Sequence, residues 1–76
     1  MYTIKNKSQA MFQRIRGKYY SECIGITQPY VYNILKGFKC AEICARAIIS
    51  VYFNVSFDDK QRIDELLEEH FDKLED

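Results

Sequence analysis

The apolar positions between residues 17 and 37 follow two short helical periods that are separated by one glycine, Gly25. In the first period, Tyr20 and Ile24 lie four residues apart, with the small Ser21 beside them. This spacing gives one apolar helix face with room for a neighbouring helix. Glycine readily adopts the left-handed conformation in which a helix ends, so Gly25 predicts a sharp turn.

A second helix is expected to begin at Thr27, because a threonine side chain can accept a hydrogen bond from the free amides of the next turn. Pro29 falls in the first turn, where its missing amide hydrogen costs nothing. Val31, Ile34 and Leu35 repeat at helical spacing and should face inward. The remaining side chains form a donor-rich strip on the other side: Gln28, Pro29, Tyr32, Asn33 and Lys36. Residues 17–37 therefore show a helix–turn–helix pattern whose polar strip suits the major groove of DNA.

Three more helices are expected around this pair. Apolar residues at helical spacing predict a first helix from about Ile4 to Arg14 or Ile15, with Met11 and Phe12 on the same face. A fourth helix, over about residues 41–53, is unusually apolar. Its Ile43, Ala47, Ile49, Ser50 and Phe53 are expected to cover the back of the pair, while Ile48, Val51 and Tyr52 extend the apolar surface.

A fifth helix is expected over about residues 58–74. Hydroxyl and carboxylate groups stand at its start, where a helix N-terminus is stabilised by them. Six residues then follow helical spacing: Ile63, Leu66, Leu67, His70, Phe71 and Leu74. With 76 residues the chain has room for one domain, so we expect an all-α fold, a compact bundle of about five helices.

The net charge of zero hides a strong asymmetry. Residues 1–56 carry eight basic and two acidic side chains, a net charge of +6, whereas residues 57–76 carry three basic and nine acidic ones, a net charge of −6. The domain is thus predicted to combine a basic body, which attracts phosphate, with an acidic C-terminal helix.

Other classes find less support in the sequence. There is no apolar run near 18 residues and no signal-peptide pattern, so we expect a cytoplasmic protein without a membrane contact. No nucleophile with a matching base and no glycine-rich phosphate loop is present, so we expect no enzyme and no cofactor. Cys23, Cys40, Cys44 and His70 could be written as a zinc set, but small core residues are the preferred interpretation of the cysteines.

Residues 17–56 resemble the helix–turn–helix domain of the phage repressor and Cro family, also called the XRE type, of small bacterial and phage transcription regulators. The resemblance lies in the spacing of apolar, small and turn positions: Tyr20-Ser21, Gly25-Ile26-Thr27, Val31, Ile34, Gly37, Ile43, Ile49 and Phe53-Asn54-Val55-Ser56. The sequence departs from the family at Lys36, where glutamate is frequent, at Ala41, where proline is common, and at Arg46, where an apolar residue is usual.

The resemblance implies a lambda-repressor-like DNA-binding domain whose third helix enters the major groove of double-stranded DNA. The matching base-contact positions are Thr27, Gln28, Pro29, Tyr32, Asn33 and Lys36. Phosphates would be held by Arg14, Arg16, Lys18 and Lys39. For Tyr32 and the lysines, an ordinary solvent-exposed role remains the alternative.

Proteins of this kind usually act as homodimers, because one small module buries little surface on DNA. Two surfaces are candidates for pairing, the apolar fourth helix and a seam on the fifth, with these residues: Ile48, Tyr52, Ile63, Leu67, His70 and Leu74. The alternative is that the seam folds back onto its own domain. A second functional class also stays open, an antirepressor-type module that binds another phage regulator protein instead of DNA.

Overall fold

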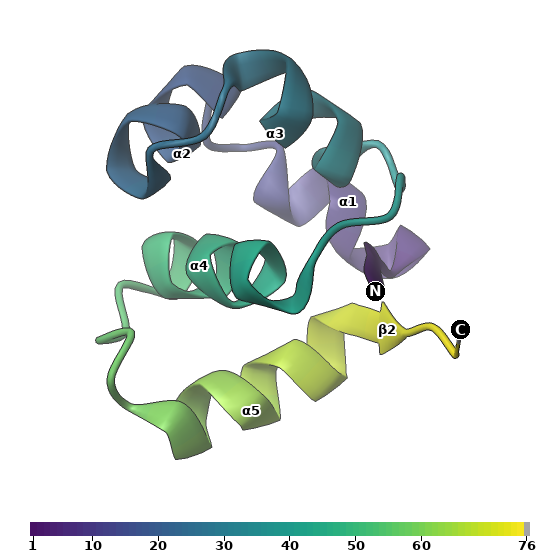
Figure 1. Cartoon of the computed structure of the whole chain (residues 1–76), viewed down its shortest axis with the longest axis vertical. Coiled ribbons are helices and arrows are strands. Elements are labelled where there is room, and N and C mark those ends of the chain that lie inside the picture. Colours follow the sequence, from purple (N-terminus) through teal and green to yellow (C-terminus); the bar gives the residue numbers. More distant parts are fainter. Residues whose placement is uncertain (76) are drawn as a thin grey trace.

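Figure 1 shows the computed structural model of the chain, which describes residues 1–75. The elements follow in the order β1 (Tyr2–Ile4), α1 (Asn6–Phe12), α2 (Gly17–Ile24), α3 (Gln28–Leu35), α4 (Glu42–Phe53), α5 (Lys60–His70) and β2 (Phe71–Lys73). Helix α4 runs through the middle of this compact, mostly helical domain, with α2 and α3 on one side and α5 on the other (Figure 1). Within residues 1–75, no helix combines the length and the apolar character needed to cross a bilayer.

A small sheet replaces both ends of the expected all-α bundle. Strand β1 pairs with β2 in antiparallel fashion, with Thr3 opposite Asp72. On its other side, Tyr2 exchanges two backbone hydrogen bonds with Cys40, at 2.8 and 2.9 Å. The prediction of a helix from Ile4 was therefore wrong. Ile4 is buried as expected, but it is buried from a strand whose partner lies near the other end of the chain.

The fifth helix is shorter than predicted. The Asp59 side chain accepts a hydrogen bond from the Arg62 amide at 3.3 Å, which confirms that a carboxylate caps the start of the helix. The helix ends at His70 and not at Leu74, because Phe71 adopts an extended conformation, with φ −128° and ψ 151°, and begins β2. Phe71 fits the apolar pattern either as a continuation of the helix or as the first residue of a strand, so periodicity alone could not distinguish a helix from a strand here.

Helix α4 has the predicted range, but its buried stripe is rotated from the expected one. Ala45, Ile48 and Ile49 are fully buried, whereas Ile43 is 65% exposed. The stripe shifts because α5 covers the side of α4 that faces away from the α2–α3 pair (Figure 1). Arg46, the unusual residue at an apolar position, is accommodated by an ion pair with Asp64 of α5.

Of the two alternatives for the α5 seam, the structure has the one in which it folds back. Four expected dimer-surface residues are buried within their own domain: Ile48, Ile63, Leu67 and His70. The other two, Tyr52 and Leu74, are half-buried. Most of the expected pairing surface is therefore covered within the domain and is not free.

His70 ties the end of α5 to the N-terminal elements. Its Nδ1 atom lies 2.8 Å from the Ser8 hydroxyl, and its ring lies 5.5 Å from the ring centre of Phe12 and 5.2 Å from that of Phe53. Burial lowers the pKa of His70, with further lowering from Lys7 and Lys5, against an opposing effect of Glu69. The neutral imidazole is therefore the form that the fold prefers.

We expect His70 to make the domain less stable in acid. Because its pKa is lower in the folded chain, the unfolded chain binds the proton more readily. The stabilisation is fully present above the ordinary value of 6.5 and is lost as the pH falls through the lower, folded-state pKa. The melting temperature should decrease between neutral pH and about pH 5, and this decrease should be larger for wild type than for His70→Gln. Equal losses in both proteins would contradict this role.

Candidate nucleic-acid interface

The α2–α3 pair is fixed by a turn and by two buried or half-buried hydroxyls. Gly25 has φ 84° and ψ 27°, and its amide donates to the Ser21 carbonyl at 2.8 Å. The Ser21 hydroxyl donates across the turn to the Ile26 carbonyl. Below them the fully buried Tyr20 donates from its hydroxyl to the Phe12 carbonyl at 2.8 Å, and burial raises its pKa. The predicted helices and the left-handed turn at Gly25 are confirmed.

Replacing Gly25 by alanine should destabilise the domain by about 1 kcal/mol. A Cβ atom at this position meets no heavy atom within 4 Å, so the cost comes from the left-handed backbone and not from a clash. Gly25→Asn should cost less, because asparagine tolerates this conformation better than alanine. Urea unfolding of the three proteins measures the difference, and an alanine variant as stable as wild type would be inconsistent with a strained turn.

The polar strip of α3 is exposed, as predicted. Val31, Ile34 and Leu35 face the core, while five side chains on the other side are open to solvent: Gln28, Pro29, Tyr32, Asn33 and Lys36. Pro29 lies in the first turn of the helix. Thr27 occupies the N-cap position and is exposed, but its side chain makes no capping hydrogen bond, so that part of the prediction was wrong.

Tyr32 packs against α2, a contact that sequence spacing did not suggest. A Cβ atom at Gly17 would lie 2.8 Å from Cε1 of Tyr32, so the absence of a side chain at Gly17 makes room for the ring. Tyr32 is still 44% exposed. The ring and the start of α2 line a groove along α3, together with the following residues: Gln13, Ile15, Arg16, Leu35 and Lys36.

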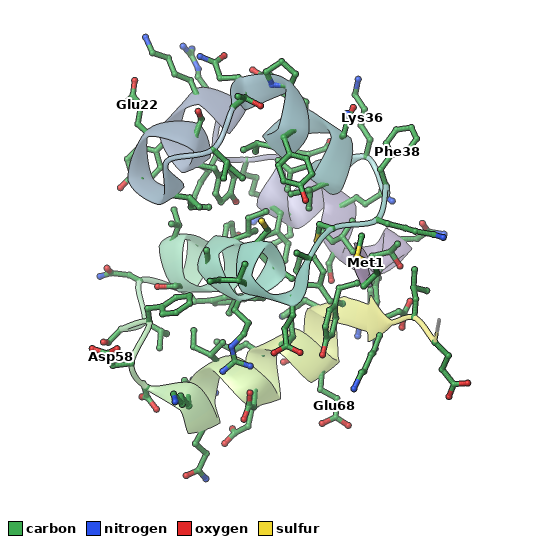
Figure 2. The ribbon with its side chains drawn as sticks, in the orientation of Figure 1. Met1, Glu22, Lys36, Phe38, Asp58 and Glu68 are labelled. Carbon is green, nitrogen blue, oxygen red and sulfur yellow. The ribbon has the colours of Figure 1, made fainter. Side chains whose placement is uncertain are left out.

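The C-terminus of α3 ends in a Schellman motif. The Gly37 amide donates to the Ile34 carbonyl at 3.1 Å, and the Phe38 amide donates to the Asn33 carbonyl at 3.0 Å. Gly37 supplies the required positive φ of 108°. Figure 2 shows Lys36 and Phe38 projecting together from this end of the helix into solvent.

The expected phosphate-binding side chains lie in segments that adjoin α2 and α3. Arg14, Arg16, Lys18 and Lys39 are all exposed. Lys18 lies 4.0 Å from Glu22 in a surface pair that contributes little. Within residues 1–75, Arg14, Arg16, Lys36 and Lys39 form no ion pair, so their charges are available to a ligand.

The acidic helix lies away from the polar strip. Asp58 and Glu68 project from the end of the domain that is opposite to Lys36, with α4 between α5 and the α2–α3 pair (Figures 1 and 2). The negative charge of the C-terminal segment therefore does not cover α3. Lys36 and the acidic residues Asp58 and Glu68 instead lie at opposite ends of the domain.

The cysteines lie in three different environments. Cys40 is fully buried, and burial raises the pKa of its thiol to about 11, with a contribution from Cys44. Cys44 is half-buried and Cys23 is exposed, so the interpretation as core residues was wrong for Cys23. Within the described chain, no three His, Cys, Asp or Glu side chains gather in a group that could hold a metal ion.

A second groove lies between α2, α4 and the loop after α4. None of its lining residues is charged, and two of them, Ile43 and Phe57, are exposed. The groove is lined by Cys23, Ile24, Ile26, Ile43, Cys44, Ala47, Ser50, Val51 and Phe57. The sequence pattern placed Ile43 in the core and therefore did not reveal this groove.

Comparison of the chain with protein-family models, with curated proteins and with solved structures gives no match.

Proposed function

We propose that this protein is a sequence-specific DNA-binding regulator of transcription that places α3 in the major groove of double-stranded DNA. The observation that carries the proposal is the free polar strip of α3, held outward by three buried residues on its other side. An α-helix with its side chains is about 10–12 Å in diameter, which matches the width of about 12 Å of the major groove. In this proposal the α2–α3 pair acts as a helix–turn–helix unit.

The strip has the chemistry to read bases. The amides of Gln28 and Asn33 can each form paired hydrogen bonds with adenine, and Lys36 can donate to guanine. Pro29 and Tyr32 offer apolar surface to a thymine methyl group. Thr27 precedes the helix and can donate to a base edge or a phosphate.

Charge supports the same orientation. Arg14, Arg16, Lys18 and Lys39 lie beside the two helices, where they would hold phosphates and set the register of the protein on the duplex. The acidic α5 stays on the far side of α4 (Figure 1), so it does not compete with DNA for these groups. A regulator of this size would act as a homodimer, and pairing would have to use surface other than the buried face of α5.

Salt-dependent binding to a labelled duplex tests this function. The duplex is obtained by selection from random sequences with the wild-type protein, and fluorescence anisotropy gives its affinity at several salt concentrations. The proposal predicts selection of a defined sequence and a slope of log K against log salt of about −0.9 for each phosphate contact. Lys39→Ala should make the slope less steep by about 0.9, the value of one phosphate contact, whereas Lys60→Ala on α5 should leave the slope unchanged. Absence of binding even at low salt would refute the proposal.

A protein-binding role on the same scaffold is the second candidate. The uncharged groove with Ile43 and Phe57 favours it, because exposed apolar surface of this kind is typical of protein contacts. In that case the chain would bind another regulator and would show no preference among duplexes. Ile43→Ala would then weaken the complex with the other regulator and would not change the affinity for DNA.

A further inference from the structure

Phe38 is an exposed aromatic residue in a rigid position. It is 61% exposed, and none of the aromatic ring pairs found among residues 1–75 includes it. Its backbone is nevertheless fixed, because its amide closes the Schellman motif through the Asn33 carbonyl at 3.0 Å. The backbone from which the ring projects is thus fixed at the end of α3, although the ring does not pack in the core.

No aromatic partner accounts for the ring of Phe38. In a Schellman motif, the residue after the left-handed glycine often packs against an apolar residue three or four positions before the helix cap. Here those positions hold Asn33, which is polar and exposed, and Tyr32, whose ring lies beside Gly17 at the start of α2. Neither Tyr32 nor another ring in residues 1–75 forms a ring pair with Phe38.

The surroundings of the ring point to a nucleic acid. Lys36 and Lys39 lie on either side of Phe38 in sequence, and neither forms an ion pair within residues 1–75. Lys36 and Phe38 project in the same direction from the end of the polar strip (Figure 2). Lysines are depleted in the core of protein–protein interfaces, whereas they are favoured beside phosphates.

We propose that Phe38 is an apolar DNA contact that lies against the deoxyribose faces of the backbone at the edge of the groove occupied by α3. This inference rests on the proposed function and adds a residue that contributes to affinity without reading a base or neutralising a phosphate. Lys39 would bind the adjacent phosphate, and the ring would exclude water between this phosphate and the end of the helix.

The salt dependence of binding separates an apolar contact from an ionic one. Phe38→Ala should weaken binding to the selected duplex by about tenfold, because most of a phenylalanine side chain would lose its buried surface. The slope against salt should not change, since no phosphate contact is lost. Phe38→Leu should retain part of the affinity. Ile43→Ala is the matched control, because Ile43 is equally exposed but lies in the groove that contains no residue of α3, and it should bind like wild type.

Three results would overturn the inference. The first is a Phe38→Ala protein that binds as tightly as wild type. The second is an equal loss of affinity for Ile43→Ala, which would indicate a general effect of exposed apolar surface. The third is a change of oligomeric state in Phe38→Ala, measured by sedimentation, which would assign the ring to a protein contact. A wild-type protein that selects no duplex would instead refute the proposed function, so the two failures are distinguishable.

Discussion

Replacing Gln28 and Asn33 by alanine is expected to remove most of the preference for the selected duplex over unrelated duplexes. Each amide can make a paired hydrogen bond with a base, and such a pair is worth about 1–3 kcal/mol of discrimination, or about 5- to 150-fold in affinity. The double variant should therefore bind the selected duplex far more weakly while keeping its binding to unrelated DNA. Competition between the two kinds of duplex measures this ratio.

The control for this prediction is Lys39→Ala. It should weaken binding to all duplexes alike, because a phosphate contact carries no sequence information. Both amide side chains and Lys39 are exposed, so neither change should alter the melting temperature. An unchanged ratio in the Gln28 and Asn33 double variant would show that α3 does not read the sequence.

The second large effect concerns stability. Phe12 is fully buried, and its ring lies 4.7 Å from that of Tyr52, 5.8 Å from that of Phe53 and 6.0 Å from that of Phe71. Phe12→Ala should lower the free energy of unfolding by about 3–5 kcal/mol, because a large cavity would remain among these rings. The free energy of unfolding of a domain of this size is roughly 4–11 kcal/mol, so the variant should be partly unfolded.

Urea denaturation followed by circular dichroism measures this loss. Phe57→Ala is the comparison variant, since Phe57 is 44% exposed and its removal should cost only about 1 kcal/mol. Similar losses for the two variants would show that Phe12 is not a central core residue.

The α2–α3 pair was predictable because its signals are local. Gly25 ends one helix, Pro29 lies in the first turn of the next, and Val31, Ile34 and Leu35 turn the polar strip outward. Each of these effects acts within a few residues, so the sequence alone contains them. Thr27 shows the limit of such local rules, because it takes the N-cap position without making the hydrogen bond that favours threonine there.

The sheet and the α4–α5 packing were not predictable in the same way. Phe71 continues the apolar period of α5, and only its pairing with Ile4 makes it part of a strand. Similarly, Ile43 and Ile48 continue one apolar pattern, but Ile43 lies exposed in the groove between α2 and α4 whereas Ile48 is fully buried. Periodicity identifies an apolar face, but it does not tell which neighbour covers that face.

The candidate interface was partly predictable. Exposure of the polar strip follows from helical spacing, and the structure adds the contact between Tyr32 and Gly17 and the exposed ring of Phe38 on a fixed backbone. A sequence signal for Phe38 did exist, since an aromatic residue follows the glycine that ends α3 and lies between Lys36 and Lys39.

Titration of the labelled protein with the selected duplex, followed by amide chemical shifts, tests most directly whether α3 binds DNA. We predict that the largest changes occur at residues 27–39 and at Arg16 and Lys18, while the exposed face of α5 from Asp64 to Glu69 stays unchanged. The side-chain amides of Gln28 and Asn33 should shift with the backbone. Changes centred on α5 or on the groove around Ile43, with α3 unaffected, would contradict the account.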